Sequence, residues 1–123
     1  MKEDFTNYCD WDGKEHYEKN LEESHDIPKY LFSGENRGER KQYADKHGRH
    51  CLCKEHHHEY EMKILMRCLD YLGEEISPEE LSSEKHLWMR EIARLDKNIK
   101  KELRKIAQQV KEEVFEDGDR NSK

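Results

Sequence analysis

The sequence predicts an α+β fold that is mostly helical, and three observations support this prediction. Residues 54–72 and the segment from Ser82 onward carry apolar residues at spacings of three and four, which is typical of amphipathic helices. The stretch NLEESHDIPKYLF (20–32) has the pattern of a short strand that leads into a proline-directed turn. The chain has 123 residues, of which 42% are charged and 33% hydrophobic. A chain with so few apolar residues has room for one modest core and usually needs a staple or a long solvated helix to be ordered.

The N-terminal half is predicted to be irregular and compact. Residues 1–54 hold Pro28 and the cysteines at positions 9, 51 and 53. Within this half, Glu39 to Lys46 is good helix-forming sequence, and Gly48 is expected to end that helix.

The C-terminal half is predicted to be a helical hairpin. Residues 54–72 form its first helix, which Gly73 ends. The segment ISPEE (76–80) is a helix-start signal, with Ser77 as N-cap and Pro78 in the first turn.

From Ser82 onward we predict one long amphipathic helix. Its apolar stripe consists of Trp88, Ile92, Leu95, Ile99, Leu103, Ile106, Val110 and Val114. Such a stripe must pack on something. It either packs on helix 54–72 or forms an interface, through residues 88–114, with a second copy of the chain or another protein. Residues 118–123 are predicted to be a disordered tail.

Two short motifs predict a metal site. CDWD followed by Gly13 has the shape of a zinc knuckle, with Asp12 where the second cysteine would stand. CKEH places Cys53 and His56 three residues apart where a helix begins, so that they share one face. Zinc accepts sulfur, nitrogen and oxygen donors in a closed tetrahedral site, and we therefore expect Cys9, Asp12, Cys53 and His56 to bind Zn²⁺. Cys51 could replace one ligand, and the alternative to a site is an isolated Cys9 thiol with a solvated histidine run.

Taken together, residues 9 to about 61 resemble the HNH (ββα-metal, treble-clef) endonuclease family. That family's pattern is a cysteine pair, a strand ending in (D/H)-H-I-I-P, and L-C-x-x-C-H opening a helix. Here CDWDGK, SHDIPKYL and LCKEHH stand in that order. The resemblance implies a zinc-stapled ββα domain over residues 1–72, followed by a helical extension over 73–117.

The resemblance also implies roles for particular residues. His25 falls at the position of the general base, and His57 falls at the position that binds the catalytic Mg²⁺ or another divalent ion, with Glu61 one helical turn beyond. The chain departs from the pattern at Ser24, where the family has Asp or His, and at Asp12.

Nucleic acid, DNA in preference to RNA, is the partner that this resemblance implies. The net charge of −6 is not that of a general nucleic-acid binder, so contact must come from a local patch. The patch we expect beside the site consists of Arg37, Arg40, Lys41, Lys46 and Arg49. Since no window approaches the roughly 18 apolar residues of a membrane span, we expect a cytoplasmic protein with no membrane partner.

Three functions remain open from the sequence. The first is a metal-dependent HNH-type endonuclease that hydrolyses phosphodiester bonds. The second, which Ser24 favours, is a catalytically inactive zinc module that binds nucleic acid or protein. The third is a small helical regulatory or interaction protein that acts through its C-terminal helices.

Overall fold

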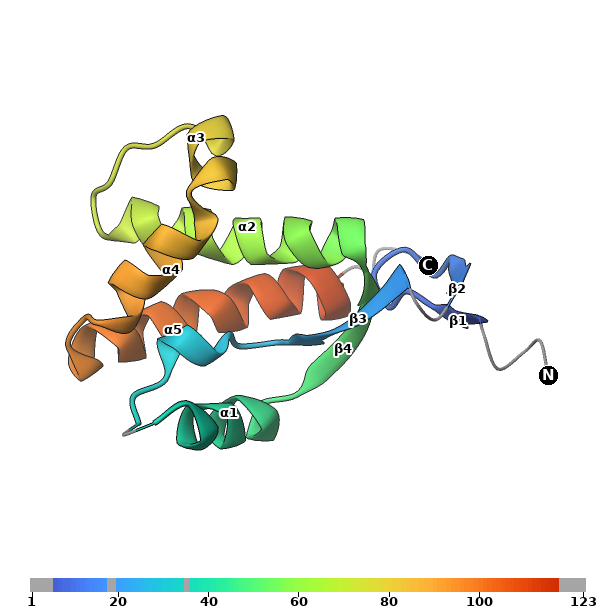
Figure 1. Ribbon diagram of the computed structural model, residues 1–123, viewed down its shortest axis with the longest axis horizontal. Coiled ribbons are helices and arrows are strands. Elements are labelled where there is room, and N and C mark those ends of the chain that lie inside the picture. Colours follow the sequence, from blue (N-terminus) through green and yellow to red (C-terminus); the bar gives the residue numbers. More distant parts are fainter. Residues whose placement is uncertain (1–5, 18–19, 35, 118–123) are drawn as a thin grey trace.

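The fold is α+β and mostly helical, as the sequence predicts (Figure 1). The computed structural model describes residues 6–17, 20–34 and 36–117. Within these residues there are two small antiparallel sheets of two strands each, and Figure 1 shows the first of them at one end of the molecule. The predicted disordered tail, 118–123, lies outside the described residues.

The first sheet is a hairpin of β1 (Thr6–Tyr8) and β2 (Glu15–Tyr17). Its turn is closed by the Cys9 N–H, which donates to the Lys14 carbonyl at 3.0 Å, and by the Gly13 N–H, which donates to the Cys9 carbonyl at 2.8 Å. Gly13 has φ of 70°, a left-handed conformation that glycine adopts without steric cost. This tight turn brings the side chains at positions 9 and 12 to the same side.

The second sheet pairs β3 (Leu21–His25) with β4 (Arg49–Cys53). Its register places Leu21 opposite Cys53, and His25 opposite Arg49. Because β4 continues directly into α2 (Lys54–Tyr71), the start of α2 lies beside the start of β3.

Two helical segments connect the strands of this sheet. A 3₁₀ turn, η3 (Lys29–Leu31), is followed by α1 (Arg37–Lys46). The side chain of Asn36 caps α1 by accepting from the Glu39 N–H at 2.8 Å, which explains why the helix begins two residues before its predicted start. Gly48, with φ of 106°, follows its end as predicted.

The predicted single helix from Ser82 is wrong, because the described residues from Pro78 onward form separate helices. These are α3 (Pro78–Ser83), α4 (Lys85–Ala93) and α5 (Lys97–Lys111), and a π-helical turn, η4 (Glu112–Asp117), follows them. The break before α5 has a local cause. The side chain of Asp96 accepts from the Asn98 N–H at 2.9 Å, and this cap competes with helix continuation. The start of α3 agrees with its prediction, since the Ser77 hydroxyl accepts from the Glu80 N–H at 3.1 Å.

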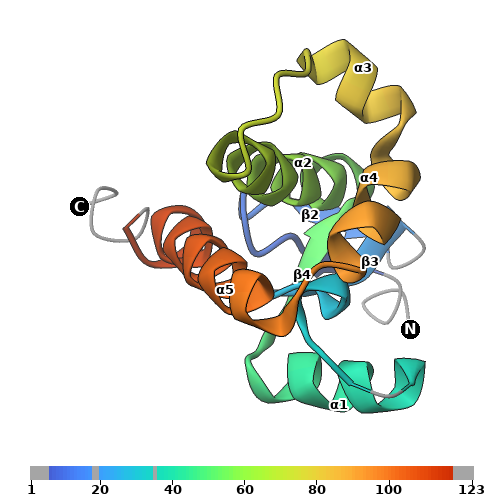
Figure 2. The same cartoon turned by 90° about the vertical axis from the view of Figure 1, so that its left-hand side faces the viewer.

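Most of the apolar stripe of the C-terminal helices packs within the chain, whereas Ile99 is exposed. Ile92, Leu103 and Val110 are all buried. Figures 1 and 2 show α5 lying along α2, while α1 lies on the other side of α5 and α3 rises away at one end. These helices share one core with the strands, made of residues that include Ile27, Leu31, Leu52, Tyr60, Ile64, Leu65, Leu69 and Ala107.

The end of α5 and the turn after it are tied to the second sheet. Lys111 Nζ lies 3.4 Å from Oδ2 of the buried Asp26, whose Oδ1 lies 2.5 Å from His50 Nδ1. The His50 ring stacks on Phe115 with 3.7 Å between centroids. The C-terminal helices therefore hold β3 and β4 in place.

Within the described residues, no helix is long and apolar enough to cross a membrane.

Candidate metal centre and adjoining cleft

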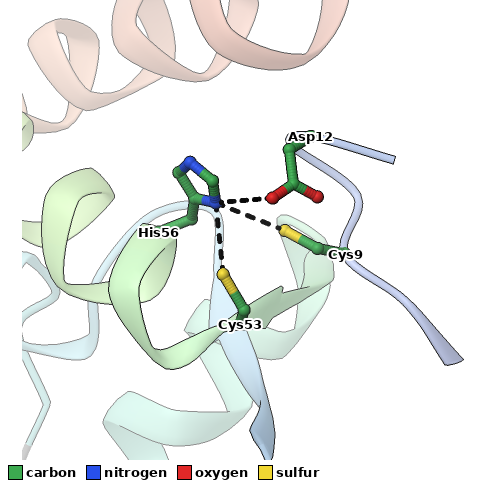
Figure 3. A group of neighbouring side chains, drawn as sticks. All are labelled: Cys9, Asp12, Cys53 and His56. Carbon is green, nitrogen blue, oxygen red and sulfur yellow. Dashed lines mark hydrogen bonds and ion pairs between the residues drawn. The ribbon is translucent and has the colours of Figure 1, made fainter. Parts of the chain in front are cut away.

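Four potential ligands converge where the first hairpin meets the start of α2 (Figure 3). One donor atom from each of Cys9, Asp12, Cys53 and His56 lies within 4.8 Å of the other three. His56 Nδ1 is at the centre of the group, 3.2 Å from Cys53 Sγ, 3.7 Å from Cys9 Sγ and 3.3 Å from Asp12 Oδ2. The structure thus brings together all four residues that the spacing argument selected.

Backbone hydrogen bonds hold the hairpin against β4 at this point. The Asp10 N–H donates to the Cys51 carbonyl at 2.7 Å, and the Cys51 N–H donates to Asp10 Oδ2 at 2.7 Å. Trp11 adds an apolar contact, with its ring 4.9 Å from the His56 ring. The side chain of Cys51 lies outside the group of four donors, and its backbone makes these two hydrogen bonds to Asp10.

The local environment suits a cation. Cys9 and Cys53 are both buried. Burial raises the pKa of the Cys53 thiol, and the charge of the neighbouring Cys9 raises it further. The Lys14 N–H donates to Asp12 at 2.7 Å and lowers the pKa of that carboxyl. His16 Nε2 is buried without a hydrogen-bond partner 3.8 Å from Asp12. Two thiols, an imidazole and a carboxylate in this arrangement could hold a metal ion.

The three residues that the resemblance assigned to catalysis lie on one cleft next to this group. The cleft has a volume of about 720 Å³, and His25, His57 and Glu61 all line it. His25 comes from the end of β3, whereas His57 and Glu61 come from successive turns of α2. The pairing of β3 with β4, which runs into α2, is what brings these distant parts of the sequence together.

Each of the two histidines is oriented by a carboxylate that sequence reasoning missed. His25 Nε2 lies 2.7 Å from Asp45 Oδ1, and His57 Nδ1 lies 2.6 Å from Glu22 Oε1. The His25 hydrogen bond is the main cause that lowers the pKa of Asp45. The pairing register of β3 with β4 is the signal that could have identified Glu22. It places Glu22 opposite Leu52, and Leu52 is followed by Cys53, the residue that precedes α2.

Glu61 has two neighbours in the cleft. Its Oε2 lies 3.5 Å from His57 Nε2, which confirms that residues 57 and 61 share a face of α2. Its Oε1 accepts a hydrogen bond from Lys85 of α4 at 2.7 Å. His58, between them in sequence, is exposed and contacts Lys85 and Ser82 instead.

The predicted basic patch is divided in the structure. Arg37 and Arg40 line the cleft, where Lys29 and Arg90 join them. The other three predicted contacts have different surroundings. Lys41 pairs with Asp45 at 3.0 Å, Arg49 pairs with Glu23 at 3.0 Å, and Lys46 lines a separate groove.

Comparison of the chain with protein-family models, with curated proteins and with solved structures gave no match.

Proposed function

We propose that this chain is a metal-dependent endonuclease of the HNH type, in which a zinc-stapled, treble-clef-like ββα unit carries the catalytic residues. One observation supports this most strongly. His25, His57 and Glu61, selected from separate motifs, line a single cleft whose wall also holds four cations: Lys29, Arg37, Arg40 and Arg90. A phosphodiester substrate needs a base, a site for a divalent ion and positive charge at one place.

Zinc is the ion we assign to Cys9, Asp12, Cys53 and His56. Thiolates and imidazole favour Zn²⁺ over Mg²⁺ or Ca²⁺, and the four donors leave no open coordination position in a tetrahedral site. The ion would join the hairpin to α2 and fix the start of the helix on which His57 stands.

His25 is the proposed general base. When Nε2–H donates to Asp45, the lone pair of the neutral ring is on Nδ1, which can take a proton from water near neutral pH. Asp45 keeps the ring in this tautomer and stabilises the charge that the ring gains. Because Asp45 also binds Lys41 at 3.0 Å, its own position is fixed within α1.

His57 and Glu61 are the residues that would hold the catalytic divalent ion. Their 3.5 Å separation is too long for a strong hydrogen bond but suits two atoms bound to one ion. Glu22 on the other ring nitrogen of His57 gives a carboxylate–histidine arrangement of the kind that orients metal ligands. When bound, such an ion neutralises charge on the phosphate and the leaving oxygen. Imidazole in the donor set suits Mn²⁺ or Ni²⁺ as well as Mg²⁺.

The test is nicking of a supercoiled plasmid by zinc-loaded protein with Mg²⁺, Mn²⁺ or Ni²⁺. We expect His25→Ala to lower the rate by about 100-fold or more, which is the usual contribution of a general base. His58→Ala is the control, because His58 is an exposed histidine next to His57 on α2 that does not line the cleft. Equal nicking by wild type and His25→Ala would contradict the proposal.

A non-catalytic zinc module is the second candidate, and Ser24 is the observation that favours it. Ser24 stands where the family has a metal ligand, and only 2% of its surface is exposed. A folded, zinc-loaded protein that binds nucleic acid but nicks with none of the three ions would support this candidate over the first.

A further inference from the structure

A second, basic groove lies between α1 and α5, away from the cleft of His25. It has a volume of about 490 Å³, and none of its lining residues belongs to that cleft. Its walls include Phe32, Tyr43, Lys46, Lys97, Lys101 and Arg104. Figure 2 shows the two helices that form it on the same side of the molecule.

The charge of this groove is of one sign. Four of its lining residues are cations and none is a carboxylate. Lys97 and Lys101 are exposed, and within the described residues no carboxylate lies within 4.0 Å of either ammonium group. The groove is thus locally positive although the chain as a whole has a net charge of −6, and it suits an anionic partner.

The cations of α5 are arranged along one line. Lys97, Lys101 and Arg104 are four and three residues apart, so they share a helix face and rise by about 6 Å and about 4.5 Å along the axis. Such spacing lets one extended chain of phosphates contact successive side chains.

Aromatic rings stand beside these cations. Tyr43, on α1, has 37% of its surface exposed, and its ring centroid lies 6.2 Å from that of Phe32. Arg104 lies over Phe32 at 5.3 Å, and Lys46 lies 6.0 Å from the Tyr43 ring centroid. An exposed ring flanked by cations is the combination that binds unpaired bases, because each base has a face that can stack.

The groove is fixed in shape before any partner arrives. Arg104 Nη1 donates to the Leu31 carbonyl at 2.8 Å, and Lys111 Nζ donates to the His47 carbonyl at 3.3 Å. These bonds connect α5 to both ends of the segment that carries Phe32 and Tyr43, so binding there needs little reorganisation.

We propose that this groove binds a segment of single-stranded nucleic acid. Phosphates contact Lys97, Lys101 and Lys46, and a base stacks on Tyr43. An acidic peptide would use the cations but not the exposed ring, and a duplex hides its base faces. The proposal does not depend on endonuclease activity, since the groove and the cleft share no residue.

The test is fluorescence anisotropy with a labelled oligothymidylate at low salt, without added divalent ions and in the His25→Ala background, so that cleavage plays no part. We expect Tyr43→Ala to weaken binding about tenfold and Tyr43→Phe to preserve it. The double variant Lys97→Ala/Lys101→Ala should weaken binding and reduce the slope of log affinity against log salt by about 1.4. Lys105→Ala is the control, because Lys105 is an exposed cation of the same helix outside the groove.

Three results would overturn the proposal. The first is absence of binding by the folded parent protein, and the second is equal affinity for a duplex of the same length. The third is that the lysine variant loses binding while Tyr43→Ala binds as tightly as the parent protein. The last would show that the groove attracts polyanions by charge alone. Thermal unfolding of each variant, followed by circular dichroism, verifies that it is folded.

Discussion

The metal-binding group and the neighbouring cleft are both built on the first turns of α2, yet their side chains are arranged in opposite ways. In the metal-binding group, the four donors point toward one another around His56 Nδ1. In the cleft, each histidine is turned toward a different carboxylate, Asp45 for His25 and Glu22 for His57. In the first arrangement the donors face one another, whereas in the second both histidines line a cleft.

Under the proposed function, this difference separates a structural role from a reactive one. A set of four ligands gives an ion no open position for substrate, whereas His25, which Asp45 holds at Nε2, keeps its other ring nitrogen available. In the proposed function α2 serves both purposes, with His56 on the structural side and His57 on the reactive side. The following predictions test that separation, beginning with the largest effect.

Removal of a ligand from the metal-binding group should have the largest effect on folding. We expect Cys53→Ala to lose bound zinc and to be destabilised by at least several kcal/mol, because the free energy of binding a structural ion adds to that of folding. Metal analysis and thermal unfolding measure both effects. Cys51→Ala is the matched control, since this neighbouring cysteine lies outside the group. Equal zinc content in the two variants would show that the four donors do not form a site.

Loss of core packing should affect stability without affecting the metal. Leu103 is fully buried at the contact of α5 with the core. We expect Leu103→Ala to lower the free energy of unfolding by about 2–5 kcal/mol in urea titrations. Leu87→Ala, at a side chain that is 49% exposed, should change it by less than about 0.5 kcal/mol. Retained zinc stoichiometry in Leu103→Ala is expected, and its loss would mean that the metal-binding group depends on α5.

The cleft should respond to changes that leave the metal-binding group intact. We expect Glu22→Gln to lower the rate of plasmid nicking about 10–100-fold, since a carboxylate that orients a metal ligand usually contributes this much. Zinc content should stay at the wild-type level. Glu59→Gln is the control, because Glu59 is an exposed carboxylate of α2 that does not line the cleft. If Glu22→Gln nicks the plasmid at the wild-type rate, Glu22 is not part of the proposed site.

The smallest expected effect concerns the ion pair that joins α2 to the turn after α5. Arg67 donates hydrogen bonds to Glu113 at 2.8 Å and 2.6 Å, and these lower the pKa of that carboxyl below its usual 4.5. A carboxyl whose pKa is lower in the folded chain stabilises the fold above its unfolded pKa. That contribution disappears as the pH falls through the folded pKa.

Glu113→Gln should therefore destabilise the protein at neutral pH by less than about 1 kcal/mol, because water screens a pair that is this exposed. The difference from wild type should shrink below about pH 4.5. Thermal unfolding at several pH values measures it. Glu91→Gln, in an exposed pair with Arg94, serves as the control. A difference that persists unchanged in acid would assign the effect to packing rather than charge.

The parts of the molecule that local spacing determines were predictable from the sequence. Cys9 with Asp12, and Cys53 with His56, are each three residues apart, and a turn or a helix brings such pairs together without help from the rest of the chain. Glu22 and Asp45 were not predictable, because their contacts depend on strand register and on how α1 packs. The break before α5 had a visible signal in Asp96, a good N-cap, but the apolar spacing across it is continuous and favours an unbroken helix.

The order in which the core and the metal ligands occur along the chain has a consequence for synthesis. All four potential ligands lie between residues 9 and 56, whereas Leu103 and Val110, which contribute to the core, come later in the chain. Because N-terminal segments leave the ribosome first, the ligands are available to a metal ion while the apolar faces of β4 and α2 are still uncovered. Under the proposed zinc binding, the ion can therefore join the hairpin to α2 before α5 packs on that helix.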